Sequence, residues 1–192
     1  GLKFLPGSSA HSILNHVFFN AGMSTEGIGI EVDSVDVTIK NTVFQGEFEG
    51  FRLLDLYKSR SLIDSCTFIM KDSNFGISAE SDTSTISHCQ FIVENGVSST
   101  FEALEIYNSN LSIQYCDFIN YSSSNPLLAN VYLGSSDTLT IMNSTIGYFS
   151  AIQLGQTNLG TVVANHNRFE GSDQVIINGS GKVDFMNNEI YF

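Results

Sequence analysis

The sequence has little positive charge. Eight lysine and arginine residues stand against twenty aspartate and glutamate residues, so the net charge is −12. A nucleic-acid-binding protein needs a basic surface to neutralise phosphates, and anionic membrane surfaces attract basic segments for the same reason. Nucleic acid is therefore excluded as a main partner, and an anionic membrane surface is disfavoured.

Long apolar runs and helical patterns are also missing. No run approaches the roughly 20 apolar residues that span a bilayer, so membrane insertion is not expected. No stretch carries a sustained apolar stripe at the 3.6-residue period, so helices are not expected. The chain opens within a pattern and shows no signal peptide, and we expect a mature product or a segment of a longer protein.

Cysteine is scarce. The three cysteines are an odd number, which argues against a disulfide framework. They are spaced by 23 residues (Cys66 to Cys89) and 27 residues (Cys89 to Cys116), which matches no zinc-binding motif. All three occupy the same position of an internal repeat, so we expect a stack of small buried thiols.

This repeat dominates the sequence. An apolar residue is followed three positions later by a small or amide residue, and five positions later by Phe or Ile. The copies are Leu14/Val17/Phe19, Ile39/Thr42/Phe44, Ile63/Cys66/Phe68, Ile86/Cys89/Phe91, Ile113/Cys116/Phe118, Ile141/Ser144/Ile146, Ala164/Asn167/Phe169 and Phe185/Asn188/Ile190. A period of about two dozen residues is the signature of a solenoid, in which each repeat contacts only its neighbours.

Each period contains three short strands. In the second period, residues 27–33 alternate, with Ile28, Ile30 and Val32 on one face, and strands over 35–39 and 42–45 follow before a return turn at 46–50. Strands that pair with their copies one period on form three parallel sheets. The sequence therefore predicts an all-β solenoid of about eight rungs, with residues 1–192 as one domain. The core contains one aromatic column, formed by Phe19, Phe44, Phe68, Phe91 and Phe118.

The motif Ile-x-x-Asn/Cys-x-Phe/Ile resembles that of the pectate-lyase-like proteins. Asn167 and Asn188 match the asparagine ladder at the bend of that family, whereas Cys66, Cys89 and Cys116 replace the amide with thiols. The resemblance implies a right-handed parallel β-helix. It also implies that the first sheet and its adjoining loops hold a polysaccharide groove.

Outward positions of the first strand of each period form two predicted columns on this face. The first contains Glu31, Asp55, Ser78, Glu105, Tyr132 and Gln153, and the second contains Asp33, Tyr57, Glu80 and Tyr107. Carboxylates interleaved with tyrosines suit a sugar ligand, because aromatic faces stack on sugar rings. The same composition is also that of an ordinary solvated face of an acidic protein.

The sequence thus favours a non-catalytic, carbohydrate-binding or adhesin-like module that is secreted or displayed at a cell surface. Its polysaccharide or glycan ligand would lie on Glu31, Asp33, Asp55, Tyr57, Glu80, Glu105, Tyr107 and Tyr132. No cofactor is expected apart from a possible Ca²⁺, for which Glu31, Asp33 and Asp55 offer oxygen ligands.

Two alternatives stay open. One is a polysaccharide lyase or glycoside hydrolase that acts on an acidic polysaccharide through Glu31, Asp55 and Arg52. The short predicted turns and the absence of a clustered Asp-His-Lys motif argue against it. The other is a structural spacer that stacks end to end or continues as a longer solenoid. It is suggested by the ends of the sequence, neither of which has the pattern of a capping element.

Overall fold

The computed structural model of the protein describes residues 1–9, 11–21, 27–46, 52–71, 75–94, 102–122, 127–149, 151–154, 159–171, 176–178 and 181–191. Within these ranges the chain forms strands β1 to β24 and no helix. The return turn predicted at 46–50 lies outside the described residues except for Gly46, which ends a strand.

The strands form three parallel sheets of eight strands each. Sheet A contains β1 (Leu2–Phe4), β4 (Ile28–Asp33), β7 (Arg52–Tyr57), β10 (Phe75–Glu80), β13 (Glu102–Tyr107), β16 (Leu127–Tyr132), β19 (Ala151–Leu154) and β22 (Ile176–Asn178). Sheet B contains β2 (Ser12–Asn15), β5 (Val37–Lys40), β8 (Leu62–Asp64), β11 (Thr85–Ser87), β14 (Leu111–Gln114), β17 (Thr138–Met142), β20 (Thr161–Asn165) and β23 (Lys182–Met186). Sheet C contains β3 (Phe18–Ala21), β6 (Val43–Gly46), β9 (Thr67–Met70), β12 (Gln90–Val93), β15 (Asp117–Asn120), β18 (Thr145–Gly147), β21 (Arg168–Glu170) and β24 (Glu189–Tyr191).

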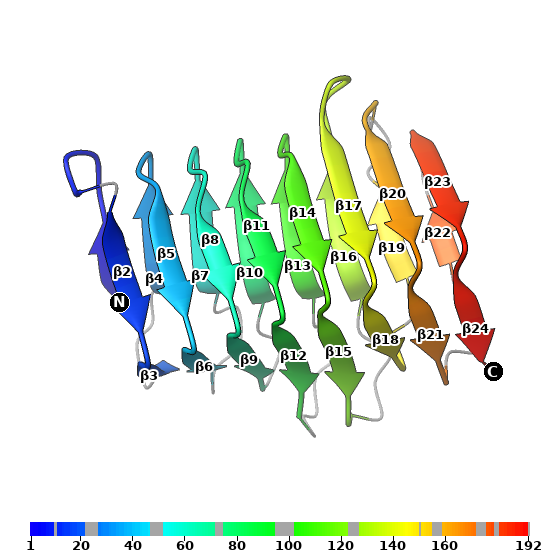
Figure 1. Ribbon diagram of the computed structural model, residues 1–192, viewed down its shortest axis with the longest axis horizontal. Helices are drawn as coiled ribbons and strands as arrows, with labels where there is room; N and C mark the ends of the chain where they lie inside the picture. Colours follow the sequence, from blue (N-terminus) through cyan, green and yellow to red (C-terminus); the bar gives the residue numbers. More distant parts are fainter. Residues whose placement is uncertain are drawn as a thin grey trace.

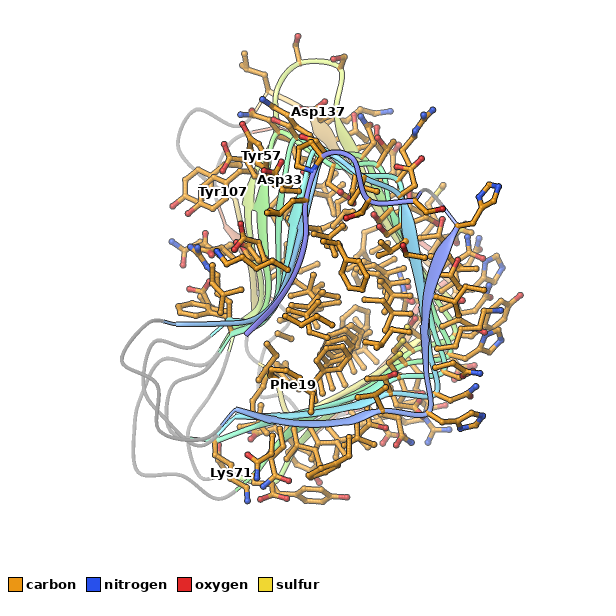
Figure 2. All side chains as sticks on the ribbon, turned by 90° about the vertical axis from the view of Figure 1, so that its left-hand side faces the viewer. Phe19, Asp33, Tyr57, Lys71, Tyr107 and Asp137 are labelled. Carbon is orange, nitrogen blue, oxygen red and sulfur yellow. The ribbon has the colours of Figure 1, made fainter. Side chains whose placement is uncertain are left out.

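Three consecutive strands, one from each sheet, make one rung of a coil. Figure 1 shows the rungs in chain order along the long axis, with the strands of sheet B descending in front of the ascending strands of sheet A. Seen from the N-terminal end in Figure 2, the chain runs clockwise as it recedes, so the coil is right-handed. The predicted fold class, an all-β parallel solenoid with three parallel sheets, is confirmed.

The interior holds the predicted aromatic column. Phe44, Phe68, Phe91 and Phe118 are fully buried, and neighbouring rings stack at centroid distances of 4.7–4.8 Å with interplanar angles of 6–8°. Phe19 joins this column at a tilt of 43°. The rings repeat because parallel, in-register strands place equivalent side chains about 4.8 Å apart along the axis.

A second interior ladder lies at the bend between sheets B and C. The backbone N–H of Ser144 donates to Oδ1 of Asn167 at 3.0 Å, and the N–H of Cys116 donates to Oγ of Ser144 at 3.1 Å. The N–H of Cys66 donates to Sγ of Cys89 at 3.4 Å. All three cysteines are free and buried, which confirms the predicted thiol stack. Thiols, hydroxyls and amides thus do the same task here, which is to pair buried backbone N–H groups.

The bend itself uses left-handed backbone. One residue per rung, just before the interior ladder position, has φ between 48° and 56°; these residues are His16, Asn41, Ser65, His88, Tyr115, Asn143, His166 and Asn187. Left-handed φ is uncommon outside glycine and carries a cost that asparagine tolerates best. The ladder beneath the bend stabilises this geometry against that cost.

The strict alternation of sheet A is interrupted near the start of each strand. Leu53 and Leu54 are consecutive and both fully buried, as are Ala103 and Leu104. Gly76 takes the place of Leu53 one rung on, because a Cβ there would lie 2.5 Å from the carbonyl oxygen of Ala103. Residues on either side of the buried pair therefore both point outward, three positions apart. This interruption places Arg52 next to Asp55 on the outer face.

Candidate functional site

The outer face of sheet A presents two rows of aligned side chains. Strand pairing aligns Glu31, Asp55, Ser78, Glu105, Asn130 and Gln153 in the first row. It aligns Asp33, Tyr57, Glu80, Tyr107 and Tyr132 in the second row. The structure therefore brings the predicted ligand-binding residues together on one face.

The placement of Tyr132 in the first row was wrong. Tyr132 pairs with Tyr107, and Asn130 occupies the first-row position beside Glu105. The reason is Ala129, which is fully buried and pairs with Leu104. The sequence interpretation took Val131 and not this small residue as the counterpart of Leu104. In the second row Tyr132 stacks on Tyr107, and their ring centroids lie 5.0 Å apart with an interplanar angle of 5°.

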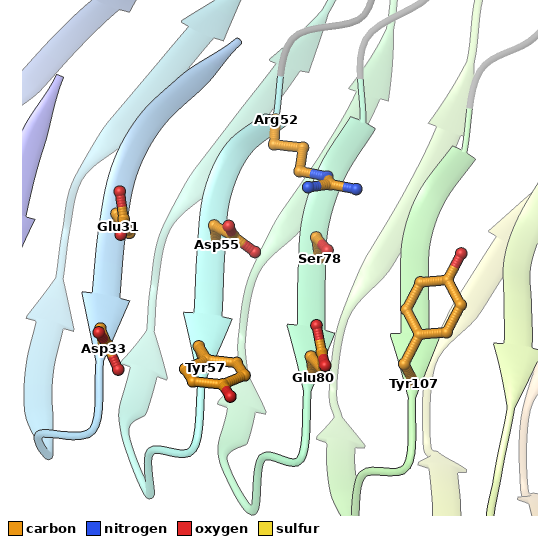
Figure 3. Close-up of a pocket in the computed structure, with 8 residues that line it drawn as sticks. All are labelled: Glu31, Asp33, Arg52, Asp55, Tyr57, Ser78, Glu80 and Tyr107. Carbon is orange, nitrogen blue, oxygen red and sulfur yellow. The ribbon is translucent and has the colours of Figure 1, made fainter. Parts of the chain in front are cut away.

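A hollow of about 160 Å³ lies on this face, and Figure 3 shows the side chains around it. We call it the sheet-A hollow. Four neighbouring strands, β4, β7, β10 and β13, supply its lining, which consists of Glu31, Asp33, Arg52, Asp55, Tyr57, Ser78, Glu80 and Tyr107. Four of these eight residues are carboxylates and two are tyrosines, so the hollow combines hydrogen-bond acceptors with aromatic surface.

Arg52 is the only cation in this lining. Its side chain reaches past Ser78 to Glu105, two rungs along the axis, and Figure 3 shows it crossing toward the next strand. Nη2 and Nε donate to Oε2 of Glu105 at 2.9 and 3.1 Å. The hydroxyl of Tyr107 donates to Oε1 of the same carboxylate at 3.1 Å. Glu105 is only 8% exposed, and these charge-assisted bonds are what allow it to be buried.

Two further cations lie at the borders of the face. Nζ of Lys3 lies 2.5 Å from Oε2 of Glu31, from the neighbouring strand β1. Nζ of Lys58 lies 4.5 Å from the ring centroid of Tyr57, in cation–π geometry. Each positive charge near the hollow therefore already has a partner.

The carboxylates of the hollow repel one another. Burial raises the pKa of Asp55, and the negative charges of Glu31 and Glu105 raise it further. Arg52 and a hydrogen bond from Ser78 oppose this shift without cancelling it. A cation or a hydrogen-bond donor that entered the hollow would relieve this repulsion.

Glu102 is an acidic residue of this face that the sequence analysis missed. Burial, followed by the charge of Glu105, raises its pKa to about 7. Nδ2 of Asn130 approaches Oε1 of Glu102 at 3.5 Å, but Oε2 of Glu102 and Oδ1 of Asn130 are buried without a partner among the described residues. The signal that could have found Glu102 is its strand position, which is that of Arg52 two rungs earlier.

The described residues contain no group of three or more His, Cys, Asp or Glu side chains placed to hold a metal ion. Within the predicted calcium set, Glu31 pairs with Lys3, and Oδ1 of Asp33 accepts a hydrogen bond from Ser34 at 2.7 Å. Calcium binding by Glu31, Asp33 and Asp55 therefore stays a prediction.

The enzyme interpretation needs a base, and the hollow offers carboxylates for this role besides Arg52 and Tyr107, neither of which is suited to it. Arg52 is held by Glu105, and a guanidinium retains its proton at any accessible pH. Burial and then the charge of Glu105 raise the pKa of Tyr107 to about 12, which disfavours the phenolate. A catalytic role for Glu31, Asp55 and Arg52 stays a prediction.

A smaller polar cluster lies on the opposite side of the coil, at the bend between sheets B and C. Nδ1 of His88 lies 3.0 Å from Oδ1 of Asp64, and the His88 ring stacks on Tyr115 at 5.3 Å. His88 and Tyr115 are both exposed. This cluster shares no residue with the lining of the sheet-A hollow, so it serves as a reference surface for tests of that hollow.

No protein-family model, no curated protein and no solved structure matches this chain. None of its described segments is a helix with the length and apolar character needed to cross a membrane. The class of protein defined so far is therefore that of the fold, a parallel β-helix with a polar, tyrosine-bearing hollow on its first sheet.

Proposed function

We propose that this protein is a non-catalytic glycan-binding module, and that the sheet-A hollow is its binding site. The observation that carries the proposal is the lining of the hollow, in which Tyr57 and Tyr107 lie among four carboxylates. Sugars are recognised by this combination, because their C–H faces pack on aromatic rings while their hydroxyls donate to charged acceptors.

The shape of the site supports a chain-like ligand. The hollow spans four strands along the axis, and the Tyr107–Tyr132 pair extends the aromatic surface one rung beyond it. Adjacent rungs repeat at about 4.8 Å, a spacing similar to the length of one sugar unit, so successive units of an oligosaccharide would meet successive rungs. A glycan lying along the axis is the ligand that this face fits best.

The proposal includes a location outside the cell or at its surface, where polysaccharides are met. It also includes membership of the pectate-lyase-like superfamily, which rests on the architecture and the bend motif alone. A shared fold does not transfer an activity. The functional part of the proposal therefore depends on the hollow and not on the resemblance.

The test is binding to a glycan array, followed by calorimetry with the oligosaccharides that give signal. We expect Tyr57→Ala and Tyr107→Ala to weaken binding about tenfold each, since each removes one aromatic contact. Tyr107→Phe keeps the ring and loses only its bond to Glu105, so it separates stacking from hydroxyl chemistry.

The matched control is Tyr115→Ala, which removes a tyrosine that is 54% exposed on the far side of the coil. This variant should bind as the wild type does. Absence of signal from every glycan, or equal losses in Tyr107→Ala and Tyr115→Ala, would remove the proposal.

A further inference from the structure

The sheet-A hollow has an imbalance between hydrogen-bond donors and acceptors. Its acidic lining residues are Glu31, Asp33, Asp55 and Glu80, whereas Arg52 is its only basic one. A ligand in the hollow therefore meets mostly carboxylate oxygens, which accept hydrogen bonds and cannot donate them when ionised.

The cations at and near the hollow each have a partner. Arg52 directs Nε and Nη2 to Glu105, and the hydroxyl of Tyr107 is directed to the same carboxylate. Lys3 is paired with Glu31, and Lys58 lies over the ring of Tyr57. A carboxylated sugar would find, as a cationic donor, only the N–H groups of Arg52 that Glu105 leaves open, and it would lie among the four carboxylates of the hollow.

The surplus of acceptors continues beyond the hollow on the same face. Oε2 of Glu102 on β13 and Oδ1 of Asn130 on β16 are buried, and neither has a hydrogen-bond partner among the described residues. Buried polar atoms without a partner are rare in folded proteins, but neither residue lines the hollow, and burial raises the pKa of Glu102 to about 7, so this carboxyl is partly protonated near neutral pH. The lining of the hollow itself is therefore the feature that points to the ligand chemistry.

We infer that the glycan recognised by the sheet-A hollow carries free amino groups, so that its ligand class is cationic amino sugars and not uronic acids. This inference rests on the proposed glycan-binding function and names its ligand. Ammonium groups would donate to Asp33, Asp55 and Glu80 while the sugar rings pack on Tyr57 and Tyr107. An acidic polysaccharide, which the enzyme interpretation assumed, would meet like charge.

The experiment compares three short oligosaccharides of equal length by calorimetry, in a buffer acidic enough to protonate a sugar amine. One is a glucosamine oligomer, one its N-acetylated form and one a galacturonic acid oligomer. We expect the glucosamine oligomer to bind about tenfold more tightly than the neutral one, and the acidic oligomer to give no signal. The preference should shrink as salt rises from about 0.05 to 0.5 M.

Matched charge variants separate the hollow from the overall charge of −12. Glu80→Gln should weaken glucosamine binding about threefold more than it weakens N-acetylglucosamine binding. Asp117→Asn removes the same charge from the outer face of sheet C and should change neither. Equal losses in both variants would show a general attraction of opposite charges and would overturn the inference.

The remaining outcomes show whether the charge inference fails alone or together with the proposed glycan-binding function. If the amine and acetylated oligomers bind equally well, or if the acidic oligomer binds best, the charge inference is wrong while glycan binding stands. If none of the three binds and the array is also blank, the proposed function fails together with the inference. Weaker glucosamine binding in Tyr107→Ala, combined with the Glu80→Gln effect, would support both.

Discussion

The inner and outer faces of the coil follow opposite rules. On the inner face, four consecutive rungs place the same residue type in one column, and the phenyl rings lie within 8° of parallel. On the outer face of sheet A, the first row reads Glu31, Asp55, Ser78, Glu105 and Asn130. The phenyl rings belong to sheet C and point into the coil, whereas the row belongs to sheet A and points out of it.

This difference shows where stability and recognition are located. A ring in the column is packed on both sides by identical rings, so each interior position depends on its neighbours along the axis. An outer position contacts its neighbours less and water more, so its identity can vary at little cost in folding.

The largest expected effect is at the centre of the inner column. Phe68→Ala removes a ring that stacks on Phe44 and Phe91 at 4.7 and 4.8 Å, and we expect it to lower the free energy of unfolding by about 4 kcal/mol. Urea denaturation followed by circular dichroism measures this change. Phe18→Ala, at an outer position that is 62% exposed, is the control and should cost less than about 0.5 kcal/mol. Similar losses in the two variants would contradict the comparison.

The interior bend ladder should rank second. In Asn167→Ala, the N–H of Ser144 and the carbonyl of Ile141 lose their buried partners, which should cost about 2 kcal/mol. Asn165→Ala, two residues earlier on the outer face, removes an exposed bond from Asn187 and should be close to neutral. Thermal unfolding of the two variants side by side gives the ranking, and a neutral Asn167→Ala would show that the ladder is dispensable.

Glu102 sharpens the comparison, because it is an outer residue in a partly buried setting. A carboxyl whose pKa rises from 4.5 to about 7 on folding destabilises the native state as the pH rises through that range. Glu102→Gln should therefore be more stable than the wild type above pH 7 by about 1 kcal/mol, after allowance for solvent screening, and the gain should vanish below about pH 4.5. Urea unfolding at both ends of this range tests it, and a gain that is independent of pH would point to packing instead.

The smallest effect is expected at Asp64, on the reference surface. Burial opposes ionisation there, but hydrogen bonds from His88 and Ser87 outweigh it and lower the pKa of Asp64. The stabilisation is present above the unfolded pKa of about 3.8 and is lost as the pH falls through the lower folded value. Asp64→Asn should cost no more than about 0.5 kcal/mol at neutral pH, because the pair is exposed. A loss above 2 kcal/mol in calorimetric unfolding would show that this outer surface resembles the core.

The same contrast explains what could be predicted from the sequence. The interior aromatic column could be predicted because the same position of the repeat holds Phe44, Phe68, Phe91 and Phe118. A repeated side chain also fixes the register of the strands that carry it. The stack of thiols could be predicted for the same reason. Alternation gave the outward direction of Glu31 and Asp55, since residues on one strand face change every second position.

The rest of the site depends on departures from the repeat. Ala129 in the core of β16 carries a weak apolar signal, so the sixth rung was placed two residues too late and Tyr132 was assigned to the wrong row. Glu102 lies beyond a pair of consecutive buried residues, where alternation gives the wrong face. The Arg52–Glu105 pair joins residues 53 positions apart, and no local pattern encodes such a contact.

The register shift between β16 and β19 has a mechanical consequence. The backbone bonds that join successive rungs run along the axis, so a force that pulls on the two ends is carried by every rung boundary in turn. Because the rung boundaries carry the force in series, the weakest boundary separates first. The pairing of β16 with β19 is irregular between Leu127 and Ala129. Under tension we therefore expect these two rungs to separate first, while the rungs that carry the sheet-A hollow stay folded on the N-terminal side.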